Sequence, residues 1–125
     1  MKWTSEKIVD WHKKTFPDAD LKSQKIKFLE EYREYLESGD ITELADMFIV
    51  NAVLTHRFSY GRFSNIVYEE LLKDDFLFNV NEFVDCKMDI NAKRVWHKVN
   101  GVYRHINQKI DYIEDKTPDL VEKPS

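Results

Sequence analysis

The spacing of apolar residues along the chain predicts a fold built from helices. Apolar side chains recur three or four positions apart, as expected for helices that bury one face. We expect helices at residues 4–14, 20–37, 40–58, 65–73 and from 79 or 81 to about 100. No segment alternates between apolar and polar residues over a useful length, as a half-buried strand would. The pattern therefore predicts an all-α fold, a compact bundle of about four to five helices, and leaves residues 102–115 unassigned.

The second and third of these helices are expected to form a hairpin. Gly39 suits the left-handed position that ends many helices. Asp40 followed by Glu43 is typical of a helix start. The connection is therefore a short turn, and the two helices should lie side by side.

The third helix is apolar on nearly all sides between residues 44 and 54. A helix without a polar face is buried on more than one side, which favours a central position in the bundle or a place in a subunit interface. Its apolar surface exceeds what a small monomer covers easily, so we expect a core completed by dimerisation. Asp46 lies inside this run, and an ionised carboxylate there is costly unless it is paired or binds a metal.

Composition narrows the class of protein. The 125 residues suit one domain, expected at residues 1–116, with a mobile tail at 117–125. A net charge of −4 argues against a protein whose main partner is nucleic acid. Cys86 is the single cysteine, which indicates a reducing, cytoplasmic setting without a disulfide framework. No apolar run has the length of a membrane span, and the first residues lack the apolar core of a signal peptide.

Two pairs of carboxylates are the strongest candidates for chemistry. Glu31 and Glu34 lie about one turn apart in the second helix, and Glu43 and Asp46 are spaced in the same way in the third. Where two such pairs converge, their mutual repulsion favours a divalent cation, and Mg²⁺ prefers oxygen ligands. On a helical wheel Glu31 and Glu34 border the apolar stripe of the second helix, whereas Glu30 points farther toward solvent. The members of this predicted stripe are Leu21, Phe28, Leu29, Tyr32, Tyr35 and Leu36.

Each acidic residue also has an ordinary alternative. Glu31 can form an ion pair with Lys27 on a solvated helix face. Glu43 can be the capping-box partner of Asp40. Asp46 has fewer alternatives, the best of which is an ion pair with a basic side chain: Arg57, His56 or a basic residue elsewhere.

A basic edge is predicted on the last helix, beside its apolar stripe. Its members fall within about 60° of one another on a helical wheel: Lys87, Asn91, Arg94 and Lys98. Along that edge one anionic group can meet two cations and an amide. The alternative is a solvated edge whose long side chains cover apolar neighbours.

Aromatic residues and histidines add one weaker candidate. Trp11 and His12 can form the edge of a base-stacking pocket. The commoner arrangement for such a pair is a core tryptophan beside a surface histidine. His105 has no companion at metal-ligand spacing, so no role is assigned to it. Nucleophile constellations of serine or cysteine, glycine-rich phosphate loops and paired-histidine zinc motifs are absent from the sequence.

The acidic residues resemble the signature of a known family, the all-α nucleoside triphosphate pyrophosphatases of the MazG-like superfamily. The resemblance lies in the pattern Glu30-Glu31-x-x-Glu34 followed by Glu43-x-x-Asp46. Only eight residues separate Glu34 from Glu43, fewer than in many relatives.

The second half of the chain agrees with this resemblance. Residues 87–96, followed by 101–105, are similar to the closing segment of the phage and prophage dATP/dGTP pyrophosphohydrolase branch. Trp11 and the dipeptide at 16–17 are also similar to that branch, although less specifically. The resemblance spans roughly residues 11 to 105.

The resemblance implies a helical core that forms homodimers or dimers of dimers. It implies an Mg²⁺ ion, with Mn²⁺ as a substitute, held by four carboxylates: Glu31, Glu34, Glu43 and Asp46. It also implies contacts to the triphosphate or sugar from three residues of the basic edge, with Trp11 as a further candidate: Lys87, Asn91 and Arg94.

The reaction that the resemblance implies splits a nucleoside triphosphate, with purine deoxynucleotides as candidate substrates, into a monophosphate and pyrophosphate. Glu30 and Glu31 are the candidate catalytic residues, because a carboxylate outside the metal site, Glu30, can accept the proton of the attacking water. Two other functions stay open from the residues alone. One is a non-catalytic helical adaptor that keeps the fold, and the other is a metal-dependent hydrolase of a different phosphorylated metabolite.

Overall fold

The computed structural model describes residues 2–73 and 80–105 of the chain. The chain divides into two compact units, residues 1–92 and 93–125, and each is described by itself. The predicted boundary at residue 116 and the predicted tail lie outside the described residues.

The described part of the chain is predominantly helical, with five helices and a small two-stranded sheet, in broad agreement with the all-α prediction. All five helices lie in the first unit. None of the described helices combines the length and the hydrophobicity needed to cross a membrane. The helices are α1 (Ser5–Thr15), α2 (Leu21–Ser38), α3 (Ile41–Arg57), α4 (Ser64–Lys73) and α5 (Val80–Asn91). The first four agree with the predicted segments to within about two residues, which is the usual uncertainty of a helix end.

Local hydrogen bonds explain where α2 and α3 begin and end. Asp20 and Ser23 bond each other's backbone N–H groups and so cap the start of α2. Gly39 ends α2 in the left-handed conformation, with φ of 68°, where a side chain would be unfavourable. The carboxylate of Asp40 then accepts the backbone N–H of Thr42 at 3.0 Å and starts α3. The turn between the two helices is therefore as short as predicted.

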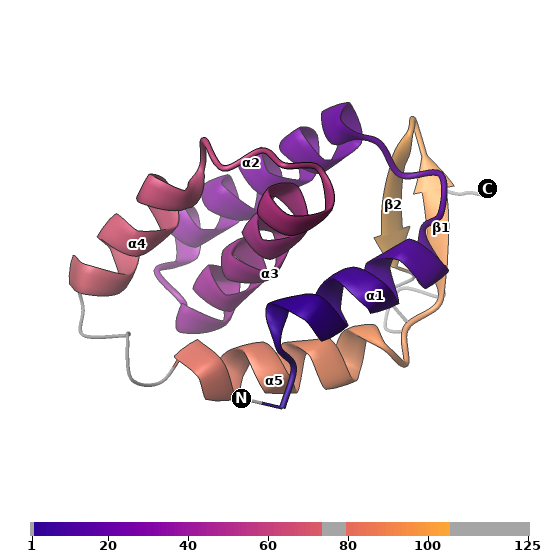
Figure 1. Cartoon of the computed structure of the whole chain (residues 1–125). Helices are drawn as coiled ribbons and strands as arrows, with labels where there is room; N and C mark the ends of the chain where they lie inside the picture. The colour runs from indigo at the N-terminus through magenta and orange to yellow at the C-terminus, as the bar shows by residue number, and fades with distance from the viewer. Residues whose placement is uncertain (1, 74–79, 106–125) are drawn as a thin grey trace, which may run out of the picture. The chain divides into compact units, whose positions relative to one another are not determined.

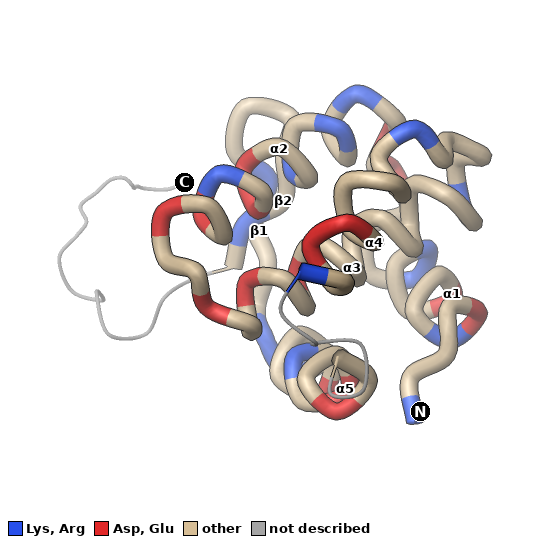
Figure 2. The backbone as a smooth tube through the Cα atoms, turned by 90° about the vertical axis from the view of Figure 1, so that its left-hand side faces the viewer, with Lys and Arg blue, Asp and Glu red and all other residues tan. Residues whose placement is uncertain are grey.

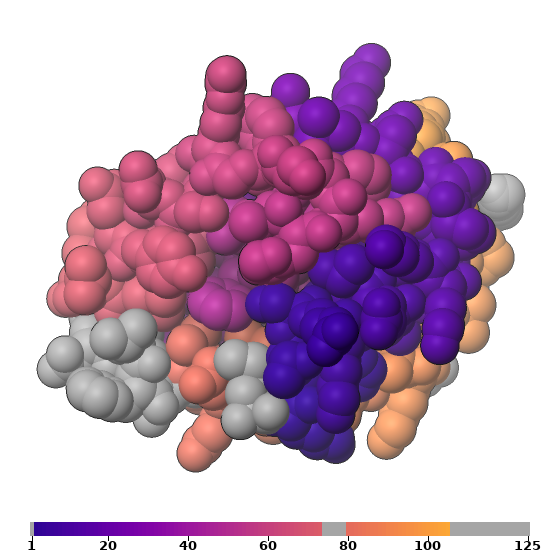
Figure 3. Space-filling model, viewed as in Figure 1, coloured from indigo at the N-terminus to yellow at the C-terminus, as the bar shows by residue number. Residues whose placement is uncertain are grey.

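The central helix of the first unit is α3, which packs against α1, α2, α4 and α5 (Figure 1). In the space-filling view α1 and α4 occupy much of the viewed face (Figure 3). Its buried residues are Leu44, Ala45, Met47, Ile49, Val50, Asn51, Ala52, Val53 and Leu54. The predicted central position is confirmed. The expectation that a monomer leaves this helix uncovered is wrong, because four helices of the same chain cover it.

Part of the apolar surface that stays exposed lies on α2. Further exposed apolar residues lie on α4, on α5 and in the second unit: Tyr68, Leu72, Ile90, Val95 and Val99. Phe28 and Tyr35 of its predicted stripe are buried, as expected. Leu29 and Leu36, which were predicted in the same stripe, are 52% and 61% exposed. Together with Ile26, which is 38% exposed, they form one flank of the helix, which we call the α2 flank.

The second unit contains a β-hairpin whose first strand lies where the sequence predicted helix and whose second strand lies in the segment left unassigned. Strand β1 (Trp96–Val99) pairs antiparallel with β2 (Val102–His105). The turn between them consists of Asn100 and Gly101, which both have positive φ, 52° and 81°. An Asn-Gly pair with this backbone conformation is the favoured two-residue turn of a hairpin. The predicted extension of the fifth helix to residue 100 is therefore wrong, and α5 ends at Asn91.

Candidate functional site

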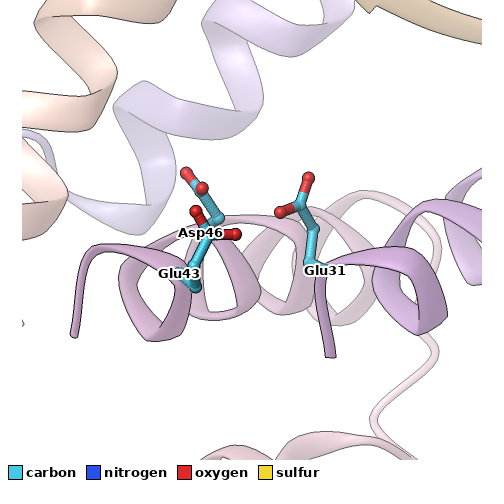
Figure 4. Close-up of side chains that lie close together, drawn as sticks. All are labelled: Glu31, Glu43 and Asp46. Atoms are coloured by element: carbon cyan, nitrogen blue, oxygen red, sulfur yellow. The ribbon is translucent and has the colours of Figure 1, made fainter. Parts of the chain in front are cut away.

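The hairpin of α2 and α3 brings three of the predicted carboxylates to one place. Glu31 comes from α2, while Glu43 and Asp46 come from the first two turns of α3. One oxygen from each of the three lies within 4.8 Å of the others. Figure 4 shows the three side chains with their carboxyl groups turned toward one another. We call Glu31, Glu43 and Asp46 the acidic cluster.

Burial makes this cluster unusual for acidic side chains. Glu31 is 8% exposed, and the side chain of Asp46 is 17% exposed. The Oε2 atom of Glu43 is buried and has no hydrogen-bond partner among the described residues. The capping-box alternative for Glu43 does not account for this buried oxygen, which lies in the cluster. A buried carboxylate oxygen without a partner is costly, because its hydration is lost without replacement.

Two lysines neutralise part of the cluster. Lys27 Nζ lies 3.3 Å from Glu31 Oε2, which confirms the predicted ion pair within α2. Lys87 Nζ, from α5, lies 3.1 Å from Asp46 Oδ2. The partner of Asp46 is therefore a basic residue from a distant part of the chain. Figure 2 shows that α1, α2 and α5 carry both signs of charge, so such pairing is available along the unit.

The cluster raises the pKa values of its glutamates. Burial, followed by the charge of Asp46, raises the pKa of Glu31 to about 7, although Lys27 opposes the shift. Burial and a hydrogen bond with the Glu34 side chain raise the pKa of Glu43 to about 7, and the charge of Asp46 adds to the effect. Near neutral pH the two glutamates are therefore partly protonated, because their ionised forms are unfavourable beside Asp46.

Of the two remaining predicted glutamates, Glu34 lies at the edge of the cluster. Glu34 is exposed and approaches it through the hydrogen bond with Glu43. Glu30 is half-buried on α2. The structure thus brings three of the four predicted metal ligands within reach of one another and places Glu34 beside them.

The predicted basic edge is divided by the end of α5. Lys87 and Asn91 share this helix, and Asn91 is buried, with its Nδ2 atom 3.8 Å from Met88 Sδ. Arg94 follows the end of the helix, and Lys98 lies on β1. The helical-wheel relation that joined all four residues is therefore wrong beyond Asn91.

Arg57 occupies a different place from the one expected. Its Nη1 atom donates to His12 Nδ1 at 2.6 Å and to the carbonyl oxygen of Phe16 at 3.0 Å. Its Nη2 atom donates to the carbonyl oxygen of Pro17 at 3.2 Å. Arg57 therefore fixes the loop between α1 and α2.

The aromatic candidates contact this same loop. His12 is buried, so the expectation of a surface histidine is wrong. Burial, with the charge of Arg57 adding to it, lowers the pKa of His12 to about 3, and its imidazole is neutral. Trp11 is half-buried and contacts Phe16 edge to face at 5.3 Å between ring centroids. His105 contacts Trp96 across the hairpin at 5.7 Å between ring centroids.

The donors of the acidic cluster fit a hard divalent cation. All three are carboxylates, which suits Mg²⁺ or Mn²⁺. The Glu43 oxygen that lacks a hydrogen-bond partner would coordinate the cation. The positive charge of the cation would also offset the repulsion from Asp46 that contributes to the raised pKa values. Comparison with protein-family models, with curated proteins and with solved structures gives no match to this chain.

Proposed function

We propose that this protein is a Mg²⁺-dependent nucleoside triphosphate pyrophosphohydrolase that releases a nucleoside monophosphate and pyrophosphate. The observation that carries the proposal is the convergence of Glu31, Glu43 and Asp46 within 4.8 Å. Mn²⁺ is the expected substitute for Mg²⁺. The resemblance to the MazG-like superfamily supplies the substrate class, with purine deoxynucleotides as the first candidates.

The residues divide into three roles in this proposal. Glu31, Glu43 and Asp46 hold the metal, and Glu34 supports them through Glu43. The metal would polarise phosphoryl oxygens and lower the pKa of a bound water. Glu30, which is outside the cluster, accepts the proton of the attacking water.

The proposed substrate contacts are those that the resemblance implies. Lys87 already lies beside Asp46, where a cation can meet a phosphoryl group. Asn91, Arg94 and Trp11 are the further proposed contacts. Phosphoryl transfer depends mainly on positioning and on stabilising charge, which are the tasks of such side chains.

We also propose that the protein is a homodimer or homotetramer. The support is now the α2 flank rather than α3. Leu29 and Leu36 expose more than half of their surface on one side of α2, and exposed apolar patches often mark interfaces.

A panel of nucleoside triphosphates, incubated with the protein and Mg²⁺, tests the proposal. We expect a monophosphate and pyrophosphate in equal amounts, identified by chromatography and mass spectrometry. Asp46→Asn is the control, because it removes a cluster carboxylate and should abolish turnover. Release of inorganic phosphate alone would favour a different phosphohydrolase. The absence of metal-dependent turnover with every triphosphate would favour the adaptor.

A further inference from the structure

The two lysines at the acidic cluster come from different helices. Lys27 lies one turn before Glu31 on α2, whereas Lys87 is on α5. Their side chains are only 22% and 17% exposed. These pairs therefore differ from surface ion pairs, whose long side chains are solvated and contribute little.

Each ammonium group lies close to carboxylate oxygens that a metal ion would also bind. Lys27 Nζ is 3.3 Å from an oxygen of Glu31, and Lys87 Nζ is 3.1 Å from an oxygen of Asp46. A divalent cation among the same oxygens would repel both ammonium groups at short range, where screening by solvent is weak. The lysines and the metal therefore compete for one set of carboxylates.

A displaced lysine keeps its charge and its reach. The flexible four-carbon stem lets the ammonium group of Lys27 turn away from Glu31 while it stays close to the cluster. Lysine is a common phosphate ligand in proteins, where it acts as a point charge. An anion held at the metal is then the nearest new partner for the displaced ammonium group.

We propose that Lys27 is a positioning residue with two alternating partners, Glu31 in the metal-free protein and a phosphoryl group in the metal-bound protein. Lys87 exchanges Asp46 for the same kind of partner. This inference rests on the proposed function, because it requires the cluster to bind a divalent cation. It adds that metal and anion bind cooperatively, since the anion accepts the lysine that the metal displaces.

Calorimetric titration of the full chain with Mn²⁺ at alkaline pH tests the competition. Lys27→Met keeps the apolar stem and removes the charge, so we expect it to bind Mn²⁺ about tenfold more tightly than the wild type. Lys22→Met is the matched control, because it removes an exposed charge from the same helix. We expect the affinity of this control to equal that of the wild type.

A second titration, with inorganic phosphate present, tests the cooperativity. Phosphate should tighten Mn²⁺ binding to the wild type by about fivefold or more. Most of this gain should disappear in Lys27→Met and should persist in Lys27→Arg, which keeps the charge.

Acylation of lysines followed by peptide mapping gives a readout that needs no variant. Mn²⁺ alone should increase the labelling of Lys27 in the wild type and leave that of Lys22 unchanged. Equal Mn²⁺ affinity in wild type and Lys27→Met, or labelling of Lys27 that does not rise, would overturn the inference and leave the metal site intact. A wild type that binds no Mn²⁺ would instead overturn the proposed function, and this inference with it.

Discussion

The Nζ atom of Lys87 lies 3.1 Å from Asp46 Oδ2, and this ion pair joins α5 to α3 beside the acidic cluster. Both side chains are 17% exposed, so neither charge is fully hydrated. Removing one member leaves the other in a poorly solvated place, which costs more than the pair itself contributes. Asp46 is therefore a residue with two tasks, a partner for Lys87 and a proposed ligand of the metal.

Asp46→Asn should remove both the ion pair with Lys87 and the proposed metal ligand, and measurements with and without metal separate the two effects. A metal that binds only the folded protein stabilises it by mass action. We expect millimolar Mg²⁺ or Mn²⁺ to raise the melting temperature of the wild type and to raise that of Asp46→Asn much less. Differential scanning calorimetry with and without metal measures both shifts.

The control for Asp46→Asn is the double variant with Lys87→Met. In the metal-free state the single variant should lose about 1–3 kcal/mol of stability because Lys87 is left without its partner. The double variant should regain part of this loss and stay insensitive to metal. Equal metal-induced shifts in the wild type and in both variants would contradict the site.

Glu31→Gln should make the metal-free protein more stable and remove its response to metal. Burial is the main cause that raises the pKa of Glu31 to about 7. Above that pH Glu31 is ionised in the folded protein, and this buried charge lowers the stability. Its neutral replacement should stabilise the metal-free protein by about 1 kcal/mol or more at alkaline pH. Glu30→Gln should keep the metal response even where turnover falls, and Glu37→Gln is the exposed control on the same helix. Loss of the metal response in Glu30→Gln but not in Glu31→Gln would reverse the assignment.

The pH dependence of stability should carry the signature of the acidic cluster. The pKa values of Glu31 and Glu43 rise from 4.5 to about 7 on folding, so between these values the folded state binds more protons than the unfolded state. Stability from these groups is therefore complete below pH 4.5 and is lost as the pH rises through about 7. The difference in unfolding free energy between Glu31→Gln and the wild type should grow over this range in urea titrations. A difference that does not change with pH would contradict the raised pKa of Glu31.

Metal binding should show the opposite trend with pH. Because the metal replaces protons on Glu31 and Glu43, its affinity should increase as the pH rises through about 7. Calorimetry in two buffers of different ionisation enthalpy measures the protons released. Proton release that is absent near neutral pH would count against these two ligands.

The burial of His12, with Arg57 beside it, should make the protein sensitive to acid. The pKa of His12 falls from 6.5 to about 3 on folding, so the unfolded state binds more protons between these values. Stability from His12 is therefore lost as the pH falls below 6.5, by about 1.4 kcal/mol for each pH unit. His12→Asn keeps a neutral acceptor, so urea titrations should show less of this loss in that variant. An equal loss in both proteins would show that His12 is not the acid-sensitive group.

Arg57→Met should destabilise the protein at every pH. It removes the donor to His12 Nδ1 and to two loop carbonyl groups, those of Phe16 and Pro17. We expect a loss of about 2 kcal/mol or more in urea titrations, as is typical when buried acceptors lose a charged donor. Arg62→Met, at an exposed position, is the control.

The α2 flank should control assembly. Leu29→Glu and Leu36→Glu place charges on the exposed apolar side of α2. We expect each substitution to convert the oligomer into a monomer, which light scattering measures as a lower molar mass. Neither residue is in the buried core, so the melting temperature of the isolated chain should change little. Lys22→Glu is the control on an exposed part of the same helix. A wild type that is monomeric and fully active at micromolar concentration would contradict the proposed assembly.

Local sequence signals predicted the helix ends well where the hydrogen bonds are local. Asp20, Gly39 and Asp40 mark the ends of α2 and the start of α3 because each acts on backbone groups within a few residues. The hairpin at residues 96–105 was missed although its Asn100-Gly101 turn is also a local signal. The same pair also suits the end of a helix, since glycine is favoured at both kinds of site.

Periodicity predicted that α3 is buried, but not whether helices of the same chain or a second subunit bury it. The pattern of apolar residues in 44–54 is the same for a helix at the centre of a monomer and for one in an interface. Only the packing of α1, α2, α4 and α5 around it distinguishes the two. For the same reason, the exposure of Leu29 and Leu36 could not be predicted from the wheel of α2 alone.

The sequence by itself determined that Glu31, Glu43 and Asp46 are brought near one another, because a short turn joins the two helices that carry them. Tertiary structure alone decided the charges around them. Lys87 is 41 residues from Asp46 in the chain, and its approach depends on how α5 packs against α3. Likewise, Arg57 meets His12 rather than Asp46 because of the packing of α1 on α3. Helical spacing fixes neighbours within an element, whereas contacts between distant elements depend on how the whole core packs.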